Sequence, residues 1–443
     1  MKDWLAEHPH ILAIRAAVAD VNGQPRGKRL PARAADKALA GQMRAPLSVV
    51  NVDIRGDDIA DSPLLFETGD RDGLLKPTDR GFVPMPWLDT PTALLPMWMH
   101  RDDGTPFAGD PRHALATVLK RYAARHWQPI CATELEFYLI DDSDGPLRSP
   151  ASPRSGKRRI GGEILSIRAL DAFDSFFTDL YAACEAMGIS AEAASSEAGL
   201  AQFEVNLTHG PAMRIADDTW LFKLLTKGLA RKHGFAASFM AKPYPDDAGT
   251  GMHLHFSVLD RHGRNVFDDG TEKGSDRLQQ AVAGCLDAMA DSALIFAPHG
   301  NSYDRLVPGA HAPTSIAWAY ENRTAALRVP SGPGNARRIE HRVAGGDVNP
   351  YLLIAAVLGG AMIGIDDELT PPPPITGNAY ELQLPQIPTD WDNAIGRFEH
   401  SGLMKRIFPR ELLRNYTLTK RQERQTYATL SPEDRIATYL DTV

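Results

Sequence analysis

The sequence predicts an α+β fold with two domains, a small sheet-rich domain in residues 1–105 and a larger α+β domain in residues 106–443. Three observations lead to this prediction. A chain of 443 residues exceeds the usual size of one compact domain. Its first hundred residues hold short apolar runs separated by Gly, Pro and Asp turns, and strand-like and helix-like runs alternate in the remainder.

The N-terminal domain is expected to contain strands at His10–Val21, Leu47–Ile54 and Ala93–Met99, because these runs are apolar and bounded by turn residues. Turn-forming residues fill positions 102–106, and an amphipathic stretch that begins with an Asp-Pro pair follows at 110–125. We therefore place the domain boundary at this turn.

The second domain is expected to alternate strands and helices. The strands lie around Cys131–Ile140, Gln202–Asn206, His253–Val258 and Arg338–Arg342, and the helices near 169–187, 212–233, 275–295 and 351–364. Segments 142–160 and 366–376 are predicted loops. This pattern favours an α+β domain that carries the chemistry.

Charge and cysteine content limit the class of protein. A net charge of −8 and a pI of about 6.0 argue against a protein that binds nucleic-acid phosphates. Cys131, Cys184 and Cys285 form no CxxC pair, which suggests a reducing compartment. The longest apolar run, Tyr351–Ile365, is too short to span a bilayer comfortably, and we expect it to be a buried helix. We expect a cytoplasmic protein that acts on small molecules, with neither nucleic acid nor membrane as partner.

Carboxylates recur on the expected strands. Glu134 and Glu136 share one face, since side chains alternate along a strand with a period of two. Glu192, Glu197 and Glu204 follow in a segment of small and apolar residues that a glycine interrupts. A bend at that glycine would aim Glu197 and Glu204 at one point.

Imidazoles and arginines follow the same pattern. His253 and His255 share a face directly after a Gly-Thr-Gly loop, which allows close approach of the backbone to a ligand. Arg338, Glu340 and Arg342 share a face further along, so that an acid lies between two bases. Ionised groups on core-like strands usually have metal or phosphate partners, because uncompensated burial costs several kcal/mol or more.

Each of these motifs alone is more often a solvated face, an incidental pair or a surface salt bridge. Their combination indicates more. Many carboxylates with few imidazoles suit hard divalent cations such as Mg²⁺ or Mn²⁺, and several arginines suit phosphate oxygens. The inventory therefore predicts metal-assisted phosphoryl transfer.

The stretches TELEFYLID, KPYPDDAGTGMHLHFS, RLVPGAHAP, ENRTAALRVP and ARRIEHRVAGGDVNPYL, in this order, resemble the glutamine synthetase superfamily from about residue 10 to the C-terminus. The resemblance implies an N-terminal β-grasp domain followed by the catalytic α+β domain of that family. It also implies a homo-oligomeric ring, a hexamer or a double-ring dodecamer, with active sites between neighbouring subunits.

The resemblance further implies a role for each matching residue. Two or more Mg²⁺ or Mn²⁺ ions would be held by Glu136, Glu197 and Glu204 in one set and by Glu134, His253 and Glu340 in the other. Glutamate would bind Arg305, Arg342 and the backbone of Gly249. ATP, as co-substrate, would contact Glu192, His255, Arg328 and Arg338, and Arg323 and Arg328 would face the transferred phosphoryl group.

The family reaction explains this inventory. A carboxylate cannot expel oxide when an amine attacks, so the family first converts the γ-carboxylate of glutamate into an acyl phosphate. That step brings two anions together. Cations and arginines neutralise the growing charge, which is how phosphoryl transfer is mostly catalysed.

Two departures from the family pattern concern the amine. The flap position that is a glutamate in glutamine synthetases is His311 here, and the Asp-Gly-Ser-Ser-like segment keeps Asp53 but loses its serines. A neutral imidazole attracts ammonium less than a fixed anion does. The sequence thus resembles the γ-glutamyl-amine and γ-glutamylpolyamine synthetases, which implies an amine larger than ammonia. His311 and Asp53 are equal candidates for accepting the proton of that amine.

Ordinary glutamine synthetase, with a rebuilt ammonium site, is the nearest alternative. A guanidino kinase is a third, which Arg305 and Arg342 disfavour. A non-enzymatic relative is a fourth, which the complete set of six metal ligands disfavours. The acceptor amine, the size of the ring and any modification of Tyr380 stay open.

Overall fold

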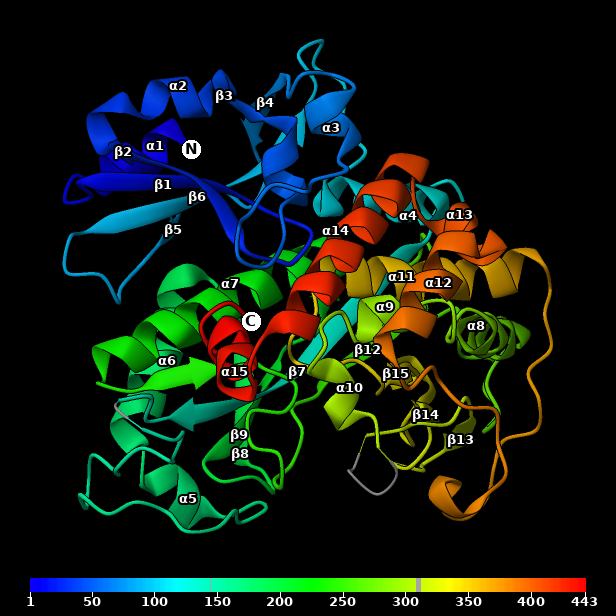
Figure 1. Ribbon diagram of the computed structural model, residues 1–443. Coiled ribbons are helices and arrows are strands. Elements are labelled where there is room, and N and C mark those ends of the chain that lie inside the picture. The colour runs from blue at the N-terminus through cyan, green and yellow to red at the C-terminus, as the bar shows by residue number, and fades with distance from the viewer. Residues whose placement is uncertain (144, 308–311) are drawn as a thin grey trace.

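The computed structural model describes residues 1–143, 145–307 and 312–443. Within these residues the chain forms two separate β-sheets, one between residues 13 and 100 and one between residues 128 and 341. Figure 1 shows the first sheet in the blue N-terminal part and the second in the cyan, green and yellow part, with helices packed around both. This mixed architecture confirms the predicted α+β class.

The first sheet has the order β2-β1-β6-β4-β3, and β5 also pairs with β6. β1 and β6 are parallel neighbours, whereas the other pairs are antiparallel. The elements of this part are β1 (Ala13–Ala19), β2 (Pro25–Pro31), β3 (Met43–Pro46), β4 (Asp72–Pro77), β5 (Val83–Pro84), β6 (Thr92–His100), α1 (Lys2–Glu7), α2 (Ala35–Leu39) and α3 (Pro63–Phe66). The β-grasp assignment and the division after residue 105 stay predictions.

The second sheet is built around the long strand β7 (Gln128–Ile140). Its order is β13-β14-β15-β12-β7-β9-β8, with β10 and β11 also paired to β7. The other strands are β8 (Ala191–Ser196), β9 (Gln202–Leu207), β10 (Gly210–Pro211), β11 (Ala236–Ser238), β12 (Met252–Leu259), β13 (Trp318–Tyr320), β14 (Leu327–Val329) and β15 (Ile339–His341). β9 and β12 flank β7 in antiparallel orientation, so three strands far apart in sequence lie side by side.

Helices pack against this sheet and along its side. They are α4 (Pro111–Ala123), α5 (Ile167–Asp171), α6 (Asp174–Met187), α7 (Ala212–Lys232), α8 (Asp276–Asp287), α9 (Ala293–Phe296), α10 (Ser302–Arg305), α11 (Pro350–Asp366), α12 (Trp391–His400), α13 (Gly402–Ile407), α14 (Arg410–Thr429) and α15 (Pro432–Leu440). Among the described residues, no helix combines the length and apolarity that crossing a membrane requires.

The apolar helix predicted after the Asn-Pro pair is α11. The side chain of Asn349 accepts hydrogen bonds from the backbone N–H groups of Tyr351 and Leu352, and Pro350 occupies the first helical position. α11 packs against α4, α7 and α8, and nearly all of its residues are buried. The prediction of a buried helix is confirmed.

The two faces of β7 differ in polarity. Leu135 and Phe137 are fully buried, and the ring of Phe137 contacts that of Phe222 on α7. Glu134 and Glu136 point to the opposite face and are only partly buried. A one-residue slip of the strand would exchange these two sets, so the buried apolar face fixes the carboxylates where they are.

The predicted strand at Leu47–Ile54 is wrong. Its first part is a short 3₁₀ helix, Leu47–Asn51. Leu47 and Val50, three residues apart, are both buried, and this is the spacing at which a 3₁₀ helix brings side chains onto one side. The apolar run therefore satisfies its burial with a helical turn instead of a strand.

Other boundaries also differ from the predictions. The helix expected at 169–187 is divided into α5 and α6, because the fully buried Phe173 turns into the core at the break, against Phe203. The helix expected at 275–295 is divided into α8 and α9, and the C-terminal helices α12 to α15 were not predicted. One long helix and two consecutive short helices can have the same spacing of apolar residues. The sequence pattern therefore does not reveal such breaks.

The helices α8 and α11 approach so closely that their backbones are in contact. A Cβ atom on Gly364 of α11 would lie 2.1 Å from the carbonyl oxygen of Gln280, and one on Gly284 of α8 would lie 2.2 Å from that of Gly360. Real Cβ atoms do not make contacts this short. Only glycine fits at this crossing.

We expect Gly364→Ala to destabilise the protein by about 1–3 kcal/mol or more, because overpacking forces the two helices apart. Gly396→Ala is the matched control, since Gly396 lies in α12 and a Cβ there meets nothing within 4 Å. This control should leave stability unchanged or raise it by about 0.5–1 kcal/mol through helix propensity. Thermal unfolding of both variants measures the difference, and equal melting temperatures would contradict the tight crossing.

Candidate active site

Acidic and imidazole side chains meet on the polar face of the second sheet. Glu134 of β7 lies opposite His253 of β12, and Glu136 of β7 lies opposite Glu204 of β9. His253 Nδ1 is 2.9 Å from Glu134 Oε2, and His255 Nε2 is 3.0 Å from the other oxygen of that carboxylate. Strand register thus assembles groups from three distant parts of the sequence.

Glu340 of β15 extends this polar face. It lies opposite His255 of β12 and Arg328 of β14, and it is only 1% exposed. Burial alone would raise the pKa of Glu340, but the charges of Arg342, the two histidines and Arg328 outweigh burial and lower it. Glu340 is therefore held as a buried carboxylate.

The arginine pair around Glu340 differs from the predicted one. Arg328 donates to one oxygen of Glu340 at 2.8 Å, and Arg342 pairs with the other. Arg338, predicted as the second base, instead lies with its Nε 3.2 Å from Nδ1 of His255. Arg328, which lies opposite Glu340 on the neighbouring strand, takes the place beside Glu340 that was predicted for Arg338. Strand β15 begins only at Ile339, so Arg338 does not share its alternation of faces.

Among the described residues, two groups of side chains have ligand atoms close enough to share one metal ion. One consists of Glu134, His253 and Glu340, and the other of Glu136, Glu204 and His253; within each group the ligand atoms lie within 4.8 Å of one another. The first group is one of the two predicted sets. The second shares Glu136 and Glu204 with the other predicted set, but His253 stands where Glu197 was expected.

The carboxylates of the second group repel one another. Burial raises the pKa of Glu204 to about 9, with further contributions from Glu134 and Glu136. Burial and the charge of Glu136 raise the pKa of Glu197 to about 7, so this carboxylate lies within the field of the cluster. A divalent cation removes this repulsion, and oxygen ligands with one imidazole suit a hard ion. The donor set therefore fits the predicted metal.

Three groups that the sequence analysis missed orient these ligands. Gln202 donates to Glu136 at 3.2 Å, and Asn206 donates to Glu134 at 3.1 Å, both from β9. The backbone N–H of Gly251 donates to Glu136 at 2.7 Å. Such bonds fix the orientation of metal ligands. The alternation of polar residues around Glu204 was the available signal, since positions 202, 204 and 206 share a strand face.

Arg305 is buried beside the Gly-Thr-Gly loop. It is 4% exposed and donates to the carbonyl oxygen of Val343 at 2.7 Å. A Cβ on Gly249 would lie 2.6 Å from Cγ of Arg305, and one on Gly251 would lie 3.0 Å from its guanidinium and 3.2 Å from Glu136. The loop glycines thus leave room for an arginine next to the second metal group.

A cavity of about 520 Å³ opens at the other metal group. Three of the predicted ATP-binding residues, Glu192, His255 and Arg338, line it together with Glu134. Apolar walls come from Ile130, Leu207 and Phe256, among other lining residues. The fourth predicted ATP residue, Arg328, does not line this cavity and instead lies between Glu340 and Glu321.

The remaining predicted residues have separate places. Arg323 is exposed, and its charge acts on Glu197. Arg342 is 7% exposed, and among the described residues its Nε has no hydrogen-bond partner. His311 lies outside the described residues.

Asp53 is distant in sequence from the carboxylate cluster. In the structure it lies next to helix α14. Its carboxylate accepts hydrogen bonds from the backbone N–H groups of Arg55 and Asp57 at 2.9 Å each, and Gln422 lies beside it. Burial raises the pKa of Asp53, and nearby Glu423 adds to this effect. In the described parts of the chain, no hydrogen bond or ion pair joins Asp53 to the carboxylate cluster.

The carboxylate groups have the donor atoms to hold divalent cations between the buried Arg305 and the cavity, an arrangement that suits metal-dependent phosphoryl transfer. The family model of the glutamine synthetase catalytic domain matches residues 108–439. The chain therefore belongs to the glutamine synthetase family and is a ligase of that family. Enzymes of the family use ATP and divalent metals.

Individual relatives are similar over their whole lengths. Gamma-glutamylputrescine synthetase PuuA of Escherichia coli (strain K12) is 34% identical, over 98% of this chain and 93% of its own. Glutamate–isopropylamine ligase of a Pseudomonas species is 30% identical, over 100% of this chain and 98% of its own. A solved structure described as a GmaS/ADP complex superposes with a TM-score of 0.85 at 26% identity, covering 98% of both chains.

The metal-free protein should lose stability as the pH rises from the ordinary glutamate pKa of 4.5 to the raised pKa values of Glu197 and Glu204, about 7 and about 9. Both values are raised above the ordinary carboxyl pKa, so folding favours the protonated forms and deprotonation works against it. Mg²⁺ should restore stability, by about 2.7 kcal/mol at roughly 100 times its Kd.

Glu204→Gln should flatten this pH dependence and reduce the gain from Mg²⁺, because it removes one charge and one ligand. The matched control is Glu192→Gln, which makes the same charge change outside both metal groups. Denaturant unfolding at several pH values, with and without Mg²⁺, measures both effects. An equal response of wild type and Glu204→Gln to Mg²⁺ would contradict the ligand assignment.

Proposed function

We propose that this ligase joins the γ-carboxyl of glutamate to an amine larger than ammonia, with conversion of ATP to ADP and phosphate. One observation supports the proposal, namely that the two metal groups share His253, with Arg305 beside one group and the cavity beside the other. Glu136 adjoins Arg305 at the Gly-Thr-Gly loop, whereas Glu134 lines the cavity. This arrangement suits two substrates whose reacting groups meet at the metals.

The proposed glutamate side is the region of Arg305, Gly249 and Arg342. Arg305 has no carboxylate hydrogen-bond partner among the described residues, and its buried guanidinium donates to a backbone carbonyl. A guanidinium in this position can bind a substrate carboxylate, and such a charge-assisted bond contributes about 1.5–3 kcal/mol. Arg342 is a further donor, since its Nε is buried without a partner in the described chain.

The proposed nucleotide side is the cavity. Its apolar walls suit an aromatic base, and Arg338 and His255 suit phosphate oxygens. The relative with bound ADP that superposes on this chain supports a nucleotide in this fold. We assign Glu192 to the same side because it lines the same cavity.

The first step makes a better leaving group. A γ-carboxylate oxygen of glutamate forms a bond to the γ-phosphorus of ATP, and the bond from that phosphorus to ADP breaks, which gives γ-glutamyl phosphate and ADP. Two or more Mg²⁺ or Mn²⁺ ions, when bound to the two groups and Glu197, would neutralise the phosphate oxygens. Arg323 and Arg328 are proposed to face the transferred phosphoryl group, where their charge opposes the repulsion between two anions.

The second step forms the amide. The nitrogen of the neutral amine bonds to the carbonyl carbon of the γ-carboxyl group, the bond from that carbon to the phosphate oxygen breaks, and the nitrogen loses one proton. An aliphatic amine with a pKa of roughly 10.4 is mostly protonated at neutral pH, so a proton acceptor must lie near it. We propose Asp53 and His311 as the two candidates.

The proposal of a larger amine rests on His311 and on the relatives. An imidazole, which carries no fixed negative charge, replaces an anionic flap residue and gives ammonium little attraction. Two relatives are named for amines with carbon chains, putrescine and isopropylamine. A chain of methylenes can contribute about 0.8 kcal/mol for each one buried.

We also propose that residues 1–105 form a β-grasp domain whose Asp53 completes the site of a neighbouring copy, in a hexameric ring or a double-ring dodecamer. Asp53 has no described link to the carboxylate cluster of its own chain, and residues 55–58 that follow it are exposed. A second copy would bring these residues to a cluster that its own chain leaves open.

The proposed function is tested by glutamate-dependent release of ADP with ammonia, monoamines, diamines and polyamines, together with identification of the product. We expect a higher kcat/KM for at least one carbon-bearing primary amine than for ammonia. His311→Glu should raise the ratio of ammonia use to amine use by restoring an anion. If the wild type makes free glutamine more efficiently than any γ-glutamyl amide, ordinary glutamine synthetase is the correct function.

The two binding regions predict opposite effects for two arginines. Arg305→Ala should raise the KM for glutamate about 10- to 150-fold, as expected for a loss of about 1.5–3 kcal/mol, and leave the KM for ATP nearly unchanged. Arg338→Ala should do the reverse. Steady-state kinetics with each substrate varied in turn measures both. A glutamate KM that stays constant in Arg305→Ala would reassign this arginine.

A further inference from the structure

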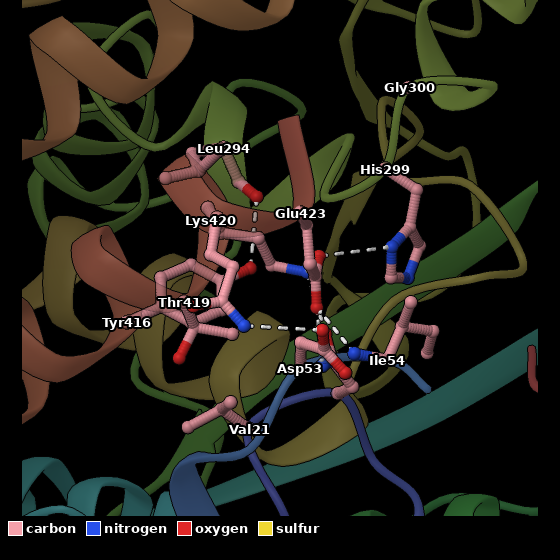
Figure 2. A network of polar contacts seen from close by, with 12 residues as sticks. Val21, Asp53, Ile54, Leu294, His299, Gly300, Tyr416, Thr419, Lys420 and Glu423 are labelled. Carbon is pink, nitrogen blue, oxygen red and sulfur yellow. Dashed lines mark hydrogen bonds and ion pairs between the residues drawn. The ribbon is translucent and has the colours of Figure 1, made fainter. Parts of the chain in front are cut away.

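Helix α14 holds the loop that carries Asp53 through a buried ion pair. Glu423 accepts hydrogen bonds from the backbone N–H of Ile54 at 2.7 Å and from the side chain of Asn22 at 2.8 Å. Its other oxygen accepts from Lys420 at 2.8 Å. Lys420 is 0% exposed and Glu423 4%, so this pair lies in the interior. Figure 2 shows Glu423 between Lys420 and His299, directly above the backbone of Asp53 and Ile54.

Burial works against the ionised carboxylate of Glu423, but Lys420 and His299 together outweigh burial and lower the pKa of Glu423 to about 2. The Lys420 ammonium also donates to the Asn22 side-chain oxygen at 2.6 Å. Removing one member of such a pair would leave the other charge buried and unpaired, so the two residues hold each other in place.

Gln422, the residue before Glu423, holds the exposed side of the same loop. Its Oε1 accepts from the backbone N–H of Ala60 at 2.8 Å, and its Nε2 donates to the carbonyl oxygen of Asp58 at 3.0 Å. The same Nε2 lies 3.4 Å from Oδ2 of Asp53. Glu423 thus binds the start of the loop at Ile54, and Gln422 binds its end at Asp58 and Ala60 and lies beside the Asp53 carboxylate.

The same pair reaches toward the glutamate side of its own chain. His299 Nδ1 lies 3.8 Å from Glu423, and the backbone N–H of His299 donates to the hydroxyl of Ser302 at 3.0 Å. Ser302 is the first residue of α10, and Arg305 is the last. α14 therefore contacts both the Asp53 loop and the segment that leads to Arg305.

We infer that Gln422 and Glu423 of α14 are positioning residues for the amine step, which hold the Asp53 carboxylate in the place where it acts on the amine. The inference rests on the proposed function, in which Asp53 borders the amine. It adds that the precision of this carboxylate comes from a helix of the larger domain. Neither residue touches a substrate.

Gln422→Ala is the preferred test, because Gln422 is partly exposed and its loss leaves the buried ion pair intact. The matched control is Arg421→Ala, which removes an exposed neighbour on the same helix whose one ion pair within the described part of the chain is with Glu399. We expect Gln422→Ala to raise the KM for the best amine of the wild type about tenfold, equivalent to about 1.4 kcal/mol. The KM values for glutamate and ATP should change less than twofold, and Arg421→Ala should resemble the wild type.

A second variant reports on Asp53 directly. Gln422→Glu keeps an acceptor for Ala60 but places a carboxylate beside Asp53, whose other charged neighbours are Glu423, Asp57 and Arg26. An added anion favours the protonated form of Asp53, so the acidic limb of kcat/KM for the amine should move to higher pH. A purely structural role of Gln422 would leave that limb in place.

These experiments distinguish failure of the proposed function from failure of the inference about Gln422 and Glu423. If the wild type shows no amine-dependent release of ADP, the proposed function fails and the inference fails with it. If the wild type is active but Gln422→Ala matches Arg421→Ala, or raises the KM of all three substrates equally, the inference alone is overturned.

Discussion

The fold forces mutually repelling carboxylates onto one face of the second sheet. The rest of the site is arranged around this constraint. Register places Glu136 opposite Glu204 and Glu134 opposite His253, and the buried apolar residues on the other face prevent these strands from slipping. Burial and like charge raise the pKa of Glu204 to about 9. Such a cluster gains stability from cations and is therefore built to hold them. In a ligase that must bring a carboxylate to a nucleotide phosphate, the same cations serve the reaction.

The surroundings of the carboxylate cluster differ between its two metal groups. Arg305 is enclosed at the Gly-Thr-Gly loop, where loop glycines leave space for it, and the cavity beside Glu134 offers apolar walls with Arg338 at its edge. Arg305 lies beside one metal group and the cavity beside the other, which suits a reaction between two separately bound substrates. α14 adds a third connection, because one buried ion pair ties the N-terminal loop to the segment that leads to Arg305. One helix outside the metal groups thus contacts both the Asp53 loop and the segment that leads to Arg305.

Sequence periodicity was sufficient to predict which side chains share a face, as with Glu134 and Glu136, because alternation along a strand is a local property. It could not predict which strands are neighbours. For this reason Arg338 was expected beside Glu340, whereas the cross-strand residue Arg328 occupies that place. The strand predicted at Leu47–Ile54 was wrong for a related reason. A short apolar run can bury its side chains either as a strand or as a helical turn, and the local sequence does not distinguish the two. The contacts of Glu423 with Asn22 and Ile54 join residues that are more than 360 positions apart, and no local pattern carries that information.

Binding of divalent cations by the carboxylate face, between the proposed glutamate and nucleotide sides, can be tested by anomalous diffraction from crystals grown with Mn²⁺ and a non-hydrolysable ATP analogue. We expect one anomalous peak among Glu134, His253 and Glu340 and another beside Glu136 and Glu204, with nucleotide density in the cavity lined by His255 and Arg338. Anomalous peaks elsewhere, with Glu134 and Glu136 turned away from any metal, would contradict it.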